Sequence, residues 1–86
     1  MQDLLNRLHQ LEREMAMARW DTARSRIALL RASPDAQRQG LPPALLDAED
    51  AARKVLPVHG KPYSHDIAKQ ALDEFEALLD RYAGWD

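Results

Sequence analysis

The first 33 residues of the chain, Met1 to Ser33, contain neither glycine nor proline, the residues that most often interrupt a helix. This segment is therefore expected to form one long helix, at about residues 2–32. At about 1.5 Å per residue, such a helix reaches roughly 45–50 Å. A compact chain of 86 residues has a radius of gyration of only about 12 Å. The rest of the chain is too short to cover this helix, so part of its apolar surface is expected to need a second molecule.

The apolar residues of this helix form two stripes. The N-terminal stripe, with steps of four, three and four residues, consists of Leu4, Leu8, Leu11 and Met15. The C-terminal stripe repeats in the same way and consists of Ala16, Trp20, Ala23, Ile27 and Leu30. The second stripe is displaced by roughly 100° around the helix from the first. We assign the C-terminal stripe to the core of the chain and the N-terminal stripe to a partner. A kinked or gently wrapped helix that buries both stripes is the alternative.

The long helix is expected to end at Ser33, because a residue that precedes proline avoids helical angles. Ser33 as the N-cap and Pro34 as the first helical residue can then start a short turn through Gln39. Gly40 stops this turn.

Two further helices are expected, at about 43–56 and about 65–83, separated by a loop with two prolines and a glycine. The first is expected to bury Leu45, Ala48, Ala51, Ala52, Val55 and Leu56, and the second Ile67, Ala71, Phe75, Leu78, Leu79 and Tyr82. The acidic residues of both helices are assigned to solvated faces. The predicted fold is one all-α domain over residues 1–86, a three-helix arrangement with two shorter helices packed against a long N-terminal helix.

The composition narrows the class of protein. The chain has no cysteine, which excludes disulfides and cysteine-type zinc sites and permits a reducing compartment. The sequence contains no run of about 18 apolar residues, so no membrane span is predicted. The N-terminus also lacks the pattern of a secretory signal. A cytoplasmic protein is expected. The preference for arginine and alanine over lysine also suggests a GC-rich bacterial or phage genome.

The two halves of the chain differ in charge. Residues 1–43 contain seven arginines and five acids, for a net charge of +2. Residues 44–86 contain five basic and nine acidic residues, for a net charge of −4. Halves of opposite sign can attract each other within one chain or between chains.

No catalytic, metal or cofactor site is predicted. The histidines, His9, His59 and His65, match no metal-binding spacing, and we interpret them as solvated side chains. Ser64 and Asp66 flank His65, but consecutive residues on a helix point in different directions and cannot form a catalytic relay. A glycine-rich phosphate loop is absent from the sequence. We therefore expect a protein that is not an enzyme.

Candidate partner-binding residues lie on the long helix. Methionine adapts to irregular surfaces, and tryptophan and arginine are enriched among the residues that dominate binding energy. The predicted partner-binding residues are Leu4, Leu8, Leu11, Met15, Met17, Arg19 and Trp20. The alternative for the residues around Trp20 is a role as core filler where the two stripes cross.

The arginines of the long helix raise a second possibility. Arg24 and Arg31 are seven residues apart, as are Arg19 and Arg26, and such rows can follow the phosphates of a nucleic acid. The overall isoelectric point near 5.9 argues against this interpretation. These arginines can equally pair with the acidic half of the chain or of a partner.

The function expected from the sequence is that of a small non-catalytic protein–protein interaction module. An adaptor, an inhibitor or a chaperone-like protein that associates as a homodimer fits the pattern. A nucleic-acid-binding accessory protein that uses Arg24, Arg26 and Arg31 is the alternative.

Overall fold

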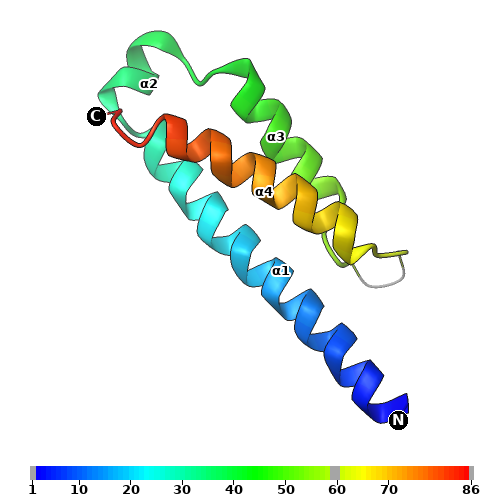
Figure 1. The fold of residues 1–86 in the computed structure, drawn as a ribbon. Coiled ribbons are helices and arrows are strands. Elements are labelled where there is room, and N and C mark those ends of the chain that lie inside the picture. The colour runs from blue at the N-terminus through cyan, green and yellow to red at the C-terminus, as the bar shows by residue number, and fades with distance from the viewer. Residues whose placement is uncertain (1, 59–60, 86) are drawn as a thin grey trace.

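The computed structural model of the protein describes residues 2–58 and 61–85. Within these ranges the chain forms helices and no strand, which confirms the all-α class. The helices are α1 (Gln2–Arg31), α2 (Pro34–Gln39), α3 (Pro43–Lys54) and α4 (His65–Arg81). The short α2 is the turn predicted after Ser33, so the arrangement has four helices of which three are long (Figure 1). The three long helices end one or two residues before the predicted positions, within the usual fraying of helix ends.

Local sequence signals explain where the helices begin and turn. The Ser33 hydroxyl accepts a hydrogen bond from the Ala36 amide at 3.2 Å and caps α2. The Ser64 hydroxyl does the same for α4, although the distance to the Ile67 amide is longer, at 3.4 Å. After α2 the chain reverses at Gly40, whose φ of 76° lies in the region that favours glycine.

α4 is the central element of the packing, because it lies along both α1 and α3 (Figure 1). α1 and α3 contact each other much less. The core formed at this junction contains Ala16, Trp20, Ala23 and Ile27 from α1, Leu45 and Ala52 from α3, Leu56 after α3, and Leu72, Phe75 and Leu79 from α4. The C-terminal stripe of α1 is therefore buried within the chain as predicted, with Leu30 half-buried at its end.

The buried face of α4 differs from the predicted one. Ala68 and Leu72 are fully buried, although the sequence pattern did not select them, whereas Ile67 is exposed. The true face is rotated by about 60° around the helix from the predicted one. The reason is that α4 contacts α1 and α3 at once, so the centre of its apolar arc depends on where both neighbours lie.

The buried face of α3 also departs from the prediction at two positions. Ala51 is exposed. Glu49, which the sequence assigned to a solvated face, is buried with 6% of its surface exposed. This carboxylate accepts a hydrogen bond from Arg31 of α1 at 2.8 Å, which compensates for its removal from water.

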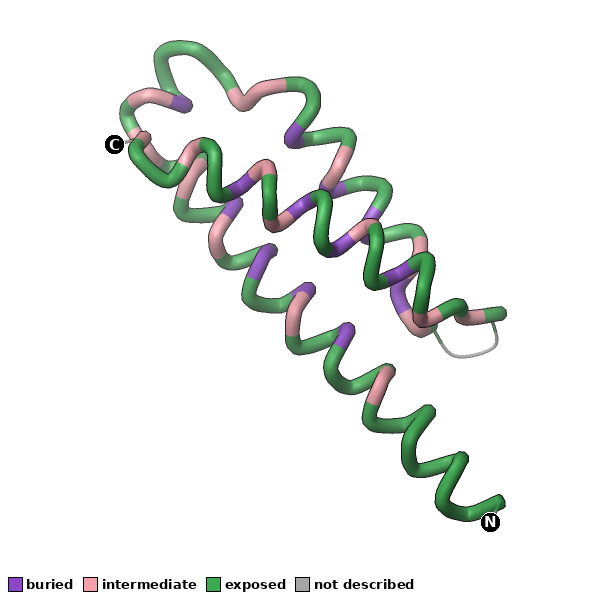
Figure 2. Tube along the Cα trace, in the orientation of Figure 1, coloured by how far each residue is buried: buried purple, intermediate pink, exposed green. Residues whose placement is uncertain are grey.

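The N-terminal half of α1 extends beyond the other helices (Figure 2). Ala16 is the first buried residue of α1, and we call the preceding residues 2–15 the overhang. The molecule is correspondingly elongated, with extents of 54 × 18 × 17 Å and a radius of gyration of 15.0 Å. A compact globule of this length would have a radius of about 12 Å.

Candidate functional site

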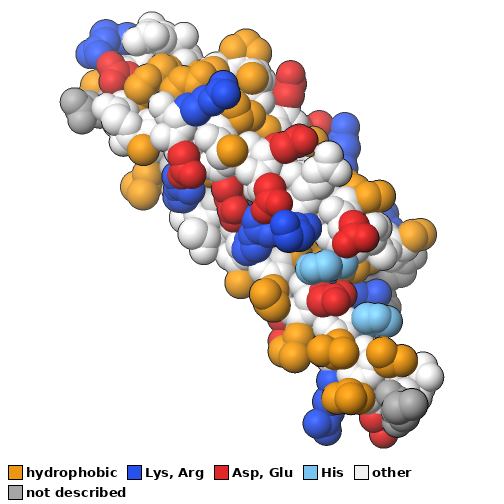
Figure 3. Space-filling model, in the orientation of Figure 1, with side chains coloured by type: hydrophobic (Ala, Val, Ile, Leu, Met, Phe, Trp, Pro, Cys, Tyr) orange, Lys and Arg blue, Asp and Glu red, His pale blue; other side chains and the backbone are white. Residues whose placement is uncertain are grey.

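The N-terminal stripe is exposed on the overhang. The exposed fractions are 63% for Leu4, 49% for Leu8, 53% for Leu11 and 61% for Met15. Figure 3 shows hydrophobic side chains gathered over this end of the molecule. Isolated exposed leucines are common on proteins, but a row of four large apolar side chains along one line of a helix is not. The four side chains thus form one row of exposed apolar surface along the overhang.

The overhang stays uncovered because the other helices begin too far along α1. The loop before α4 approaches α1 at Arg13, where the Tyr63 ring lies 5.6 Å from the guanidinium carbon. α4 begins only at His65 and first packs on α1 near Met15 and Ala16. The overhang is about 21 Å long at 1.5 Å per residue, and its residues 2–11 are all exposed.

One residue of this surface does not belong to the predicted stripe. Leu5 is half-exposed and lies about 100° around α1 from Leu4. It breaks the step of four and three residues, so a search for that spacing alone misses it. Its position beside Leu4 and Leu8 widens the apolar surface at the end of the overhang.

Charged residues flank the stripe. Arg7 and Glu14, seven residues apart, lie on the same side of it and are both exposed. Glu14 accepts a hydrogen bond from Gln10 at 3.2 Å on the same helix. Glu12 lies on the opposite side of the stripe and is half-buried near Tyr63. The stripe is thus an apolar strip between charged borders, as in helices that bind other helices.

The structure separates the other predicted partner-binding residues from this stripe. Trp20 has only 5% of its surface exposed and packs on Phe75, with 5.9 Å between the ring centroids. This position corresponds to the core role that the sequence left open. Met17 faces a different side of α1, and Arg19 faces the acidic side chains of α4. Of the residues where the two stripes cross, Trp20 is therefore buried, whereas Met15 and Met17 are exposed.

Arg19 forms a charge cluster with two carboxylates of α4. Its guanidinium donates hydrogen bonds to Asp73 at 2.6 Å and to both carboxylate oxygens of Glu76 at 2.6 and 3.1 Å. The Glu76 hydrogen bond is the main cause of a raised Arg19 pKa, although partial burial opposes it. Hydrogen bonds from Lys69 and then from Arg19 lower the pKa of Asp73. The cluster joins α1 to α4.

Two of the three arginines considered for nucleic-acid binding are also paired within the chain. Arg26 contacts Asp80 at 2.6 Å, and Arg31 contacts the buried Glu49 at 2.8 Å. Arg24 is exposed and lies on the same side of α1 as Arg31. This arrangement agrees with the alternative that the basic half pairs with the acidic half. It also leaves less positive charge for a phosphate backbone.

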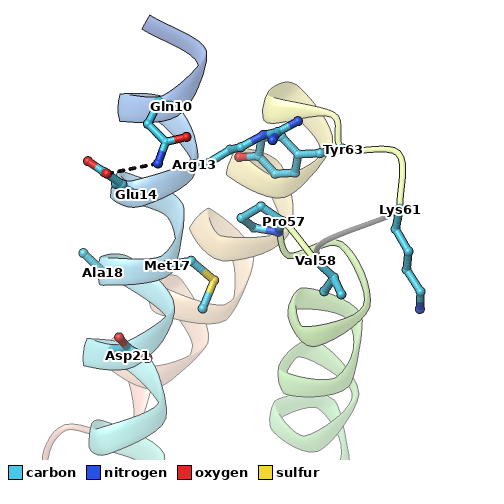
Figure 4. Close-up of a pocket in the computed structure, with 10 residues that line it drawn as sticks. All are labelled: Gln10, Arg13, Glu14, Met17, Ala18, Asp21, Pro57, Val58, Lys61 and Tyr63. Carbon is cyan, nitrogen blue, oxygen red and sulfur yellow. Dashed lines mark hydrogen bonds between the residues drawn. The ribbon is translucent and has the colours of Figure 1, made fainter. Parts of the chain in front are cut away.

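A groove of about 580 Å³ lies between α1 and the loop that follows α3 (Figure 4). Arg13 and Met17 line it from α1, and Val58 and Tyr63 line it from the loop. Burial, together with the nearby carboxylate of Glu12, raises the pKa of Tyr63. The centre of the groove lies more than 90° around α1 from the N-terminal stripe, and Glu14, which also lines the groove, lies between the two.

The described residues contain neither a cluster of metal ligands nor a membrane-spanning helix. No three His, Asp or Glu side chains among residues 2–58 and 61–85 are grouped as metal ligands, and His59 lies outside these ranges. No helix in the described ranges is both long and apolar enough to cross a membrane.

Comparison of the chain with protein families, with curated proteins and with solved structures finds no match.

Proposed function

We propose that this protein is a small, non-catalytic protein–protein interaction module that acts in the cytoplasm. Its binding surface is the N-terminal stripe of the overhang, with Leu5 at the edge. The function belongs to the class of adaptors, inhibitors or chaperone-like proteins, which act by covering or presenting an apolar surface.

The observation that carries this proposal is the exposure of the N-terminal stripe next to a fully formed core. Ala23 and Ile27 on the same helix are at most 1% exposed, whereas Leu4 is 63% exposed. Burial of apolar surface contributes about 25 cal/mol per Å², so a partner that covers the stripe gains free energy that the chain itself leaves unused.

The helical state of the overhang also supports binding to a partner. Isolated helices shorter than about 12–15 residues are marginal in water, and the overhang has little tertiary support. It is, however, continuous with the part of α1 that the core holds, so it is preorganised as a helix. Helix-in-groove recognition uses anchors at this spacing on one helix face.

Site-specific photo-crosslinking tests the proposal. A benzophenone amino acid in place of Leu8 is expected to crosslink the full chain to another protein molecule in the cells that encode it. The matched control carries the same group in place of Leu46, an exposed leucine on α3. The proposal predicts a crosslinked product at position 8 that position 46 does not give, and that Leu11→Asp abolishes. No product at position 8, or identical products at both positions, would contradict it.

A further inference from the structure

We propose that the N-terminal stripe docks on the same stripe of a second copy of this chain, with the two α1 helices antiparallel. Leu8 of each copy faces Leu11 of the other, and Leu4 of each faces Met15 of the other. This inference rests on the proposed function, because it names the partner of the same surface.

The spacing of the stripe is that of a helix that pairs with another helix. Steps of four, three and four residues place Leu4 and Leu11 at one of the two inward-facing positions of a heptad and Leu8 and Met15 at the other. In an antiparallel pair, residues of the first kind face residues of the second kind. The proposed register satisfies this rule in all four layers, and every layer is formed by large apolar side chains.

The charged border of the stripe fits this register. Arg7 immediately precedes Leu8 and Glu14 immediately precedes Met15, so both lie on the same side of the stripe. In an antiparallel pair, the residues on this side of one helix lie beside the residues on the same side of the other helix. In the proposed pair, Arg7 of each copy lies beside Glu14 of the other, and the two-fold symmetry makes this contact twice. Both side chains are exposed, and neither Arg7 nor Glu14 forms an ion pair in the described part of the chain.

Other antiparallel registers are less favourable. A shift by seven residues toward the C-terminus of α1 places Glu14 beside Glu14 of the second copy, and the opposite shift places Arg7 beside Arg7. A shift by fourteen residues pairs Glu14 with Asp21 and sets Leu8 against Ser25. Each of these registers brings like charges together, which costs stability.

A parallel pair meets a different obstacle. It would match Arg7 with Glu12, but it would also bring Glu14 beside Arg19 of the second copy. Arg19 is already hydrogen-bonded to two carboxylates of α4 at 2.6 Å each, so a third carboxylate gains little there. The parallel seam would continue into Thr22, which offers less apolar contact than the overhang. In an antiparallel pair, the packed helices of the two copies lie at opposite ends, so Arg19 and Thr22 lie outside the contact.

Cysteine crosslinking tests the register on the full chain. The sequence has no cysteine, so introduced ones report without background. When Leu4→Cys and Met15→Cys chains are mixed under mild oxidation, the mixed disulfide is expected to form faster than either symmetric one. In the proposed pair, two copies of position 4 are separated by about 16 Å along the axis, too far for a disulfide.

The outcomes of this experiment discriminate between arrangements. Efficient Leu4→Cys homodimers would indicate a parallel pair and overturn the proposal. A faster mixed disulfide between Leu4→Cys and Leu29→Cys would indicate the register shifted by fourteen residues and overturn it as well. Absence of any disulfide above the rate of random collision would show that the stripes do not meet.

Charge reversal provides a second, independent measurement. Arg7→Glu alone and Glu14→Arg alone are each expected to raise the dimer dissociation constant by about tenfold, because two attractive contacts become repulsive. The double variant restores the contacts in reversed order and is expected to recover most of the affinity. Arg24→Glu, the same charge change on another side of α1, is the matched control and is expected to leave the affinity unchanged. Failure of the double variant to recover affinity would contradict the register.

Failure of this inference is distinguishable from failure of the proposed function. If the purified chain sediments as a monomer while position 8 crosslinks to a different protein in cells, self-docking is wrong and the interaction function stands. If position 8 crosslinks to nothing, both are wrong. A crosslinked product with twice the mass of the chain supports both.

Discussion

Glu49 shows how one side chain joins two helices. Arg53, four residues later on the same helix, stays 3.9 Å from the Glu49 carboxylate. The closer partner is Arg31 of α1, at 2.8 Å, and Glu49 itself is nearly inaccessible to water. A buried carboxylate that loses its main partner keeps the cost of its desolvation.

Arg31→Ala is therefore expected to lower the free energy of unfolding by about 1–3 kcal/mol. Arg24→Ala is the control, because Arg24 is an exposed arginine on the same helix, and the expected change is within about 0.5 kcal/mol. Urea unfolding followed by circular dichroism measures both. The double variant Arg31→Ala, Glu49→Ala should lose less stability than the sum of the single changes. Additive losses would show that the two side chains do not interact.

Asp73 provides a test that depends on pH. Hydrogen bonds from Lys69 at 2.9 Å and from Arg19 at 2.6 Å lower its pKa in the folded chain. A lowered folded-state pKa stabilises the fold above the unfolded-state pKa, and this contribution is lost as the pH falls through the folded-state pKa. Asp73→Asn should therefore reduce stability at pH 7, and its deficit relative to the natural chain should shrink below about pH 4. Urea unfolding at pH 7 and at successively lower pH checks this, and a deficit that does not change with pH would refute the assignment.

At the scale of elements, α1 contains two stripes that are nearly identical in spacing and opposite in environment. Ile27 is fully buried, whereas Leu8 is about half-exposed. Ile27→Ala should cost about 2–5 kcal/mol of unfolding free energy, because it leaves a cavity in the core. Leu8→Ala should change stability by less than about 0.5 kcal/mol when the chain is dilute enough to be monomeric. Chemical unfolding at low protein concentration compares the two variants. Equal losses of unfolding free energy would mean that the overhang packs against the rest of the chain.

The helices themselves were predictable because their signals are local. The spacing of the apolar residues, the caps at Ser33 and Ser64 and the prolines act within a few residues and need no knowledge of the rest of the fold. The overhang was predictable from length alone, because a helix of 30 residues exceeds the size of an 86-residue body.

The details that the sequence missed depend on neighbours. The central position of Leu72 on the buried face follows from the packing of α4 against two helices at once. The burial of Glu49 follows from the approach of Arg31 across the gap between α1 and α3. Neither can be obtained from the periodicity of one helix. For the same reason the sequence placed both Met15 and Trp20 among the candidate partner-binding residues, although Met15 is exposed and Trp20 is buried in the core.

At the scale of the whole molecule, ion pairs between the basic and the acidic halves of the chain hold the helices together. Arg19 and Arg26 of α1 pair with carboxylates of α4, and Arg31 pairs with α3. The arginine rows that resembled a phosphate-binding surface are thus largely occupied inside the monomer. In contrast, Arg7 and Glu14 on the overhang form no ion pair within the described ranges, so charge on the overhang remains available to a partner.

The length of the particle in solution separates the proposed dimer from its alternatives. The monomer is 54 Å long, and the proposed register overlaps two copies along about 16 residues, or roughly 24 Å. The dimer should therefore be about 80 Å long, whereas a parallel dimer would be thicker and no longer than the monomer. Small-angle X-ray scattering across a concentration series measures this dimension.

The variant with both Leu8→Asp and Leu11→Asp is the matched control, because two buried charges would prevent pairing while the buried residues of α1 are unchanged. This variant should keep the monomer length at every concentration. A natural chain that gains mass with concentration but not length would contradict the antiparallel arrangement, and a control variant that still lengthens would show that another surface carries the contact.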